Sequence, residues 1–185
     1  FGIAGATPAA ASAASDEVAL LNLLNNTRQK QGLRPLTMNS ALSYDARRWT
    51  NEMVGAGGLS HTPSSRMVSE VQRVVPSWQL IGENVGYAYS VSQLHQAFWD
   101  SPKHRDNMLG DYTHVGIGVA YKGSAIWVTF RYVKGSPVMG TSTYSSTVAG
   151  FSDVVSSAYY ATPVKWLVQK GITTGVGNTG QYQPD

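Results

Sequence analysis

Apolar residues recur at helical spacing in four segments of the chain. The first segment carries an apolar stripe made of Val18, Leu20, Leu21, Leu23 and Leu24. Ser15 precedes two acidic residues, which favours a helix start, and Gly32 supplies a helix end. The second segment ends at the run GAGG, residues 55–58, and its stripe consists of Leu42, Ala46, Trp49 and Met53.

Two further helices are predicted downstream. Residues 64–75 have a helical pattern that Pro76 ends, and residues 91–102 have another that Pro102 ends. The intervening loop 59–63, with sequence LSHTP, places His61 just past the end of the second helix.

Three segments favour extended structure. Residues 78–90 are apolar, aromatic and interrupted by glycine, which is typical of a strand. Residues 114–121 and 125–133 are joined by Lys-Gly-Ser and predict a β-hairpin. Helices in mixed order with such strands predict an α+β fold, a three-layer α/β/α sandwich around a mainly antiparallel sheet, plus a short helical fragment at the C-terminus.

The composition changes along the chain and predicts four regions. Residues 1–15 lack an initiator Met and are rich in Ala and Ser, which is typical of the start of a processed, exported protein. Residues 16–134 form the main domain, and the Gly/Ser/Thr-rich residues 135–150 are interpreted as a linker. Residues 151–185 form a distinct unit, too small to bury its own apolar face, with a helix through Tyr160, Val164 and Leu167.

Composition also limits the chemistry. Hydrophobic residues make up 42% and charged residues 14% of the 185 positions, so a packed core is expected. The net charge of +3 contains no block of Lys and Arg, which argues against a nucleic-acid partner. Cysteine is absent, so disulfides, thiolate metal sites and cysteine nucleophiles are excluded. No apolar run approaches the length of a membrane span.

Three side chains stand out as candidates for metal binding or proton transfer: His61, Glu83 and His104. Two neutral imidazoles and one carboxylate suit Zn²⁺ or another divalent metal with an open position for water. They equally suit acid–base chemistry in which Glu83 orients an imidazole. Spacing does not establish that the three meet, because more than twenty residues separate each from the next.

A set of motifs follows in order along residues 17–133, namely LLNNTRQKQGLRPL, LSYDARRW, LSH, IGENV, FWDSPKHRDNML, THVGIGVA and WVTF. Together they resemble the CAP superfamily (cysteine-rich secretory proteins, antigen 5 and pathogenesis-related 1) in its cysteine-free bacterial form. The C-terminal unit, with FSDV, WLVQKGI, TTG and Y-x-P-D, resembles the first half of an S-layer homology repeat. Such repeats are similar to modules that anchor proteins to bacterial cell-wall polymers, although this half is not expected to bind the polymer by itself.

The CAP resemblance implies an α/β/α sandwich with a cleft lined by two histidines and two acidic residues, often binding a divalent metal through the histidines. By motif position His61 and His104 are the histidines, the expected metal ligands, and Glu83 is the first acid. The other residues of the HRDNML motif are expected to fix a turn and its packing, namely Asn107, Met108 and Leu109.

The resemblance leaves the second acid without a counterpart. Asp100 follows Trp99 too closely, and Glu70 and Asp106 have no motif that supports them. His114, at the start of a predicted strand, is interpreted as a structural or rim residue.

Three functional hypotheses follow. In the first, a secreted or cell-wall-associated CAP domain uses His61, Glu83 and His104 to bind a divalent metal and hydrolyse an extracellular polymer; no Ser or Thr shows the surroundings of an activated nucleophile. In the second, the domain is a non-catalytic extracellular binding module for glycan, lipid or peptide. Four aromatic residues could form its binding surface, namely Trp78, Tyr87, Tyr89 and Trp127. Trp127 and most of the others are expected in the core. In the third, it is a structural display domain.

Overall fold

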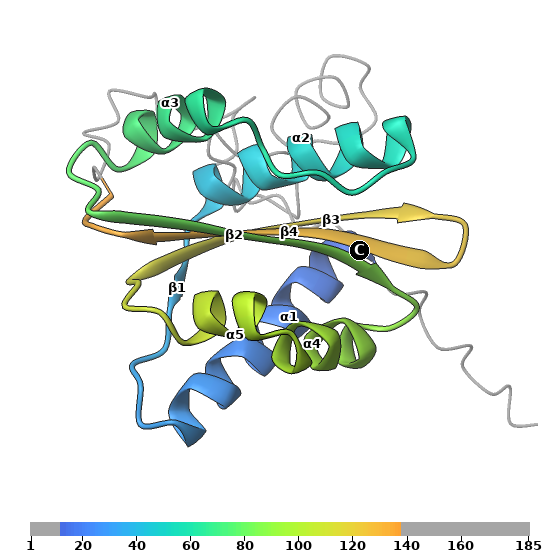
Figure 1. Ribbon diagram of the computed structural model, residues 1–185, viewed down its shortest axis with the longest axis horizontal. Coiled ribbons are helices and arrows are strands. Elements are labelled where there is room, and N and C mark those ends of the chain that lie inside the picture. The colour runs from blue at the N-terminus through green and yellow to red at the C-terminus, as the bar shows by residue number, and fades with distance from the viewer. Residues whose placement is uncertain (1–11, 138–185) are drawn as a thin grey trace, which may run out of the picture.

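The computed structural model describes residues 12–137, which form three layers (Figure 1). A four-stranded sheet is the central layer; α2 and α3 cover one face, and α1, α4 and α5 cover the other. In chain order the elements are α1 (Ala13–Lys30), β1 (Thr37–Met38), α2 (Ser40–Ala56), α3 (Ser64–Val74), β2 (Leu80–Ala88), α4 (Val91–Asp100), α5 (Pro102–Leu109), β3 (His114–Lys122) and β4 (Ala125–Lys134). The predicted α/β/α sandwich is confirmed.

The sheet has the strand order β1-β3-β4-β2. The predicted hairpin is confirmed, since β3 and β4 pair antiparallel, and β2 pairs antiparallel with the other side of β4. The two-residue strand β1, which the sequence pattern did not predict, pairs parallel with the start of β3. This order leaves β2 at one edge of the described sheet, between helices of both outer layers.

Two glycines of β3 bring α2 against the sheet. A Cβ at Gly116 would lie 2.3 Å from the carbonyl carbon of Leu42, and a Cβ at Gly118 would lie 2.1 Å from the backbone nitrogen of Arg47. Only a residue without a side chain fits at this distance. The spacing of glycines in THVGIGVA therefore sets how closely the two layers approach.

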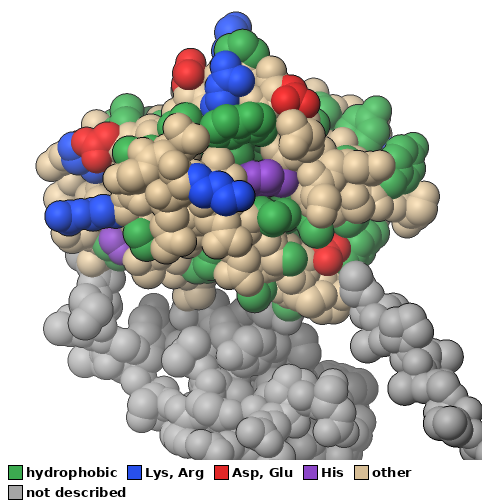
Figure 2. All heavy atoms as spheres, turned by 90° about the horizontal axis from the view of Figure 1, so that it is seen from below, with side chains coloured by type: hydrophobic (Ala, Val, Ile, Leu, Met, Phe, Trp, Pro, Cys, Tyr) green, Lys and Arg blue, Asp and Glu red, His purple; other side chains and the backbone are tan. Residues whose placement is uncertain are grey.

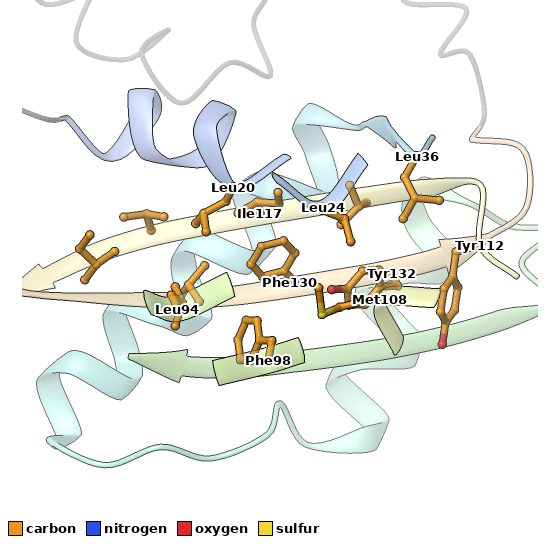
Figure 3. Close-up of a cluster of buried hydrophobic side chains, with 14 residues drawn as sticks. Leu20, Leu24, Leu36, Leu94, Phe98, Met108, Tyr112, Ile117, Phe130 and Tyr132 are labelled. Atoms are coloured by element: carbon orange, nitrogen blue, oxygen red, sulfur yellow. The ribbon is translucent and has the colours of Figure 1, made fainter. Parts of the chain in front are cut away.

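The larger hydrophobic cluster lies between the sheet and the α1/α4/α5 layer (Figure 3). Phe98 of α4 meets Phe130 of β4 edge-on, with ring centroids 5.7 Å apart. The other labelled members of the cluster are Leu20, Leu24, Leu36, Leu94, Met108, Tyr112, Ile117 and Tyr132. On the opposite face, two smaller clusters of buried apolar residues lie within residues 12–137.

The first helix differs from its prediction in where it starts and in which face it buries. It begins at Ala13 with Ser12 as N-cap, and Ser15 occupies the third helical position, where its hydroxyl completes a capping box. Leu20 and Leu24 are buried as predicted, but Val18 is 55% exposed. The buried stripe follows the i, i+4 pair at 20 and 24, and Val18 lies outside it.

The region after α4 is the second difference. Pro102 ends the preceding helix as predicted, but it also occupies the first turn of α5, whereas the sequence pattern predicted a turn. Proline is tolerated there because its missing N–H would have no intrahelical partner. The helices predicted over the second and third apolar segments and the extended segment 78–90 are confirmed. The predictions for residues 1–11 and 138–185 lie outside the described residues.

Candidate functional site

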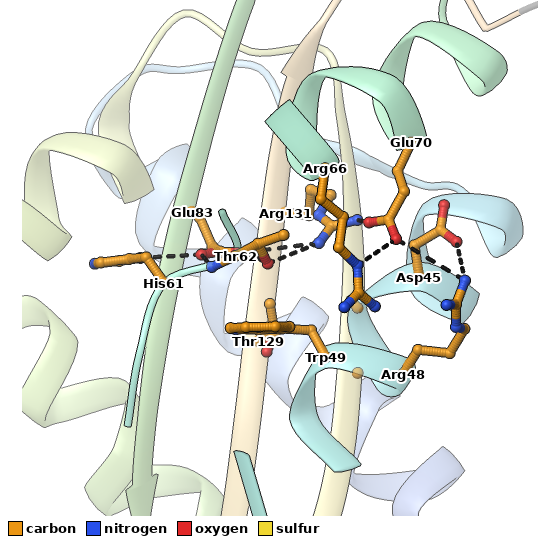
Figure 4. Close-up of polar contacts among 12 residues, drawn as sticks. Asp45, Arg48, Trp49, His61, Thr62, Arg66, Glu70, Glu83, Thr129 and Arg131 are labelled. Carbon is orange, nitrogen blue, oxygen red and sulfur yellow. Dashed lines mark hydrogen bonds and ion pairs between the residues drawn. The ribbon is translucent and has the colours of Figure 1, made fainter. Parts of the chain in front are cut away.

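Loop 57–63 carries His61 across the edge strand β2 (Figure 4). Its Nδ1 lies 2.9 Å from Oε1 of Glu83, and the two side chains are 64% and 3% exposed, respectively. The structure thus brings two of the three predicted residues into direct contact. The buried carboxylate holds one ring nitrogen, and the rest of the imidazole is open to solvent.

Every other polar contact of the Glu83 carboxylate within residues 12–137 is also with a donor. The backbone N–H of Thr62 donates to Oε1 at 2.9 Å, and the Thr62 hydroxyl donates to Oε2 at 2.6 Å. The guanidinium of Arg131 lies 3.6 Å from Oε2. A buried carboxylate surrounded in this way is fixed in orientation, because moving it would leave several groups without partners.

A chain of ion pairs runs from Glu83 through Arg131 to helix α3. Arg131 of β4 is fully buried and forms an ion pair with Glu70 at 2.6 Å, which Arg66 also contacts at 2.8 Å. Burial acts to raise the pKa of Glu70, but the hydrogen bonds from Arg66 and Arg131 outweigh it, so this pKa lies below its usual value. Such pairing is the condition under which buried charges are tolerated.

Asp45 of α2 lies at the far end of this group of charges. Its side chain is fully buried and its Oδ2 accepts from Arg73 at 2.6 Å. Burial raises the pKa of Asp45, while the positive charge of Arg73 opposes the shift. Asp45 Oδ1 and Arg131 Nε have no hydrogen-bond partner among the described residues, so the network is imperfectly satisfied.

The triplet Gly82-Glu83-Asn84 serves both faces of β2. Asn84 contacts the opposite layer, where its Nδ2 donates to the carbonyl of His104 at 3.0 Å. Asn107 of α5 donates to the carbonyl of Glu83 at 3.1 Å and to Oδ1 of Asn84 at 2.8 Å. These bonds dock α5, and with it His104, against the edge strand.

Gly82 makes room for that docking. A Cβ there would lie 2.3 Å from the Tyr112 hydroxyl and 2.8 Å from Oδ1 of Asn107. The predicted packing role of Asn107 and Met108 is confirmed, since the first bonds to β2 and the second is buried in the core.

His104 enters from the α5 side and is partly buried, with its ring 4.9 Å from that of Phe98. Burial lowers its pKa, and the positive charge of His61 lowers it further. Electrostatics therefore links the two histidines, whereas Glu83 contacts only His61 directly among the three predicted residues.

The remaining candidate residues lie elsewhere. Asp100 accepts a hydrogen bond from Gln96 at 2.8 Å, and Asp106 is exposed. His114 starts β3, where it shares a hydrogen bond with the Thr113 hydroxyl. Across residues 12–137, no three His, Asp or Glu side chains are grouped so as to hold a metal ion.

Sequence reasoning missed most of the network, including Thr62, Glu70 and Arg131, which contact Glu83 or one another. Thr62 directly follows His61, and Glu70 had been considered only as a carboxylate without a motif. Arg131 offered the clearest signal, because it is a charged residue within the otherwise apolar segment AIWVTFRYV. A charge in a strand with buried residues on both faces must have a partner there.

A groove of about 460 Å³ adjoins the site, between the first half of α3 and the start of β2. His61, Thr62 and Glu83 line its polar end. Its apolar part is lined by Met67, Val68, Trp78, Leu80 and Ile81.

The outer face of the α1/α4/α5 layer shows no concentrated charge. Figure 2 shows Lys and Arg scattered on this face among acidic, hydrophobic and other side chains. In the described part of the chain, no helix combines the length and the hydrophobicity that crossing a bilayer requires.

Comparison with known proteins agrees with this architecture. The model of the CAP family, described as the cysteine-rich secretory protein family, matches residues 21–132. The chain belongs to the CAP family. The model of the S-layer homology domain matches residues 150–185. A CAP domain followed by this domain makes the chain an extracellular protein of the bacterial cell surface.

Individual relatives cover the CAP part. The uncharacterized protein YkwD of Bacillus subtilis (strain 168) is 31% identical over 125 residues, which are 65% of this chain and 48% of that protein. The chain therefore spans about half the length of the curated relative that it matches.

Solved structures share the fold. An extracellular SCP-domain protein of Bacillus anthracis str. Ames has a TM-score of 0.58 at 23% identity, covering 65% of this chain and 41% of that one. An outer surface protein of Borrelia burgdorferi has a TM-score of 0.61 at 16% identity, covering 68% and 97%. At these identities the likeness concerns the fold alone.

Proposed function

We propose that this CAP domain binds a divalent metal ion, zinc or a similar ion, through the imidazoles of His61 and His104. The observation that supports it is the contact between His61 Nδ1 and the buried carboxylate of Glu83. Histidine ligands of metals almost always donate their other ring N–H to such a partner, which orients the ring and raises its basicity. Glu83 is then an orienting residue and His61 presents Nε2 to the ion.

The donors present fit a weak and open site. Both oxygens of Glu83 are engaged by Thr62 and His61, so the carboxylate is not free to act as a ligand. Two imidazoles leave the remaining coordination positions to water or to a bound ligand. A metal held in this way would lower the pKa of a bound water and supply a hydrolytic nucleophile. Hydrolysis of an extracellular polymer is the corresponding activity.

Zinc content and calorimetric affinity test the metal proposal. The chain has four histidines, so the His61→Ala/His104→Ala variant has a matched control in His95→Ala/His114→Ala. Uptake by the native protein and by the control, with loss in the first variant only, is the expected result. Equal and low uptake by all three would overturn the proposal. If uptake follows the expectation, hydrolysis of cell-wall, protein and nucleic-acid substrates is the next measurement.

We further propose that the S-layer homology domain at residues 150–185 contributes to attachment to a cell-wall polymer. Co-sedimentation with purified wall fragments tests this, with wall fragments stripped of their polymer as the control. Binding that persists on stripped fragments would contradict the proposal.

The groove beside His61 favours a second candidate, a non-catalytic binding module for glycan, lipid or peptide. Tyr87 and Tyr89 are 51% and 68% exposed, although most of these aromatic residues had been expected in the core; Trp127 is buried as expected. Tyr87 stacks on Trp127 with ring centroids 5.1 Å apart, so its ring is held in place at the surface. Ligand binding by the metal-free protein, unchanged in the His61→Ala/His104→Ala variant, would support this function over the first.

A further inference from the structure

The hydroxyl of Thr62 occupies the only position in the described network that contacts both a buried cation and the carboxylate of Glu83. Arg131 Nη2 donates to Oγ1 at 3.0 Å, and Oγ1 lies 2.6 Å from Glu83 Oε2. Thr62 is 5% exposed and Arg131 is fully buried, so bulk water does not compete for these bonds.

Chemistry determines the direction of each bond. A guanidinium has donors and no acceptor, so the Thr62 oxygen must accept from Arg131. The single hydroxyl proton is then available for Glu83, which receives it at Oε2. The Thr62 backbone N–H donates to Oε1, and Glu83 is therefore held as an acceptor from both sides.

This constraint reaches His61. Because Glu83 Oε1 accepts, the neutral imidazole must carry its proton on Nδ1 and its lone pair on Nε2. We propose that Thr62 is a positioning residue: its hydroxyl, held by Arg131, fixes Glu83 so that His61 keeps the Nδ1–H tautomer. The purpose of this positioning rests on the proposed function, since metal binding at Nε2 of His61 requires the lone pair on that nitrogen. The tautomer itself does not depend on a bound metal.

Loss of the hydroxyl has a specific consequence. Without it, the nearest remaining donor to Oε2 is Arg131 Nη2, at 3.6 Å. The carboxylate is then drawn toward the guanidinium and away from His61, whose imidazole reverts toward the free mixture in which the Nε2–H form predominates.

The experiment is ¹⁵N NMR of the histidine side chains in the metal-free protein at pH 8, a pH above the ordinary pKa of histidine. The His61→Gln variant identifies the His61 signals. We expect the Nδ1–H form to dominate in the native protein and in Thr62→Ser, and to lose its dominance in Thr62→Val. The matched control is Thr50→Val, because Thr50 is also buried and bonds to Gly118 and Thr129 without contacting Glu83.

A dominant Nε2–H form in the native protein would overturn the proposal, and so would an unchanged tautomer in Thr62→Val. An equal change in Thr50→Val would also overturn it, because the effect would then follow from any buried threonine. If Thr62→Val does not fold by circular dichroism, Thr62→Ala carries the same test.

Zinc affinity separates this proposal from the proposed function. Loss of an outer-shell partner weakens metal binding by about 10-fold or more, so Thr62→Val should bind zinc about 10-fold more weakly than Thr50→Val. If the native protein binds no zinc, the metal function fails, while the tautomer measurement still decides the role of Thr62.

Discussion

The two outer layers of the domain differ in the size of the apolar cluster that they bury against the sheet and in how their buried charges are connected. The buried charges of the α1/α4/α5 layer all lie on α1, namely Asp16, Glu17 and Arg28. The α1/α4/α5 layer covers one large apolar cluster. Beneath the α2/α3 layer, two smaller apolar clusters accompany a group of charges, in which Asp45, Glu83 and Arg131 are buried and Glu70 is partly buried. Apolar burial stabilises the fold without fixing one arrangement, whereas buried charges cost desolvation and tolerate only the geometry that pairs them. The large apolar cluster and the charged network around Glu83 therefore lie on opposite faces of the sheet.

The largest expected effect comes from breaking the charged side. Arg131→Met should destabilise the domain by about 3–5 kcal/mol, because Glu70 and Glu83 lose their buried partner. Chemical denaturation measures this change. A loss below about 1 kcal/mol would show that the network reorganises easily, and the contrast between the layers would be wrong.

Leu20→Ala tests the apolar side, where the side chain is fully buried in the large cluster. We expect a loss of about 3 kcal/mol from transfer and cavity terms, with the His61 tautomer unchanged. Val18→Ala in the same helix is the control, since Val18 is exposed and the change should stay within about 0.5 kcal/mol. A shifted tautomer in Leu20→Ala would mean that the two layers are not independent.

Asn107→Ala tests the docking of helix α5 against the edge strand β2. Its amide donates to the Glu83 carbonyl and to Asn84, so its loss should cost about 1–2 kcal/mol. Unlike Leu20→Ala, it should also shift the NMR signals of His104, because α5 is released from β2. Equal stability loss with unchanged His104 signals would argue against this docking role.

The smallest expected effect is a pH dependence within the apolar layer. Burial lowers the pKa of His95, with a smaller effect from Lys30, and the ring shares a hydrogen bond with Thr27 between α1 and α4. A lowered pKa means that protonation favours the unfolded chain, so this stability is present above the usual histidine pKa and is lost as the pH falls through the lowered value. Denaturation midpoints at pH 7.5 and pH 5 should differ less in His95→Gln than in the native protein. An equal difference between the two midpoints in the native protein and in His95→Gln would contradict this role of His95.

The sequence predicted the parts that depend on local pattern. Alternation and helical spacing located all four predicted helices within a few residues, together with the hairpin and the edge strand, because each buries one regular face. It did not predict α5, where Pro102 both ends one helix and begins the next. It also misjudged Val18, because a run of neighbouring leucines leaves the buried face ambiguous.

The candidate site likewise has a part that local sequence motifs identify and a part that depends on contacts between distant segments. The motifs pointed to His61 and Glu83, which are in contact, and to His104, whose helix α5 packs on the other face of the sheet and whose pKa the charge of His61 lowers. Thr62 and Glu70 could not be found, since their role depends on Arg131, more than sixty residues away in the chain. Long-range pairing of polar groups leaves no periodic pattern in the sequence. The one indication of such pairing was Arg131, a charged residue within an apolar strand.

The alternation of side-chain directions at Glu83 and Asn84 along β2 couples the contact with His61 to the docking of α5. A slip of one residue would turn the carboxylate toward α5 and the amide toward Thr62, so the histidine would lose its partner and α5 its anchor in the same event. Insertions and deletions in this strand should therefore be far less tolerated than substitutions at its exposed ends.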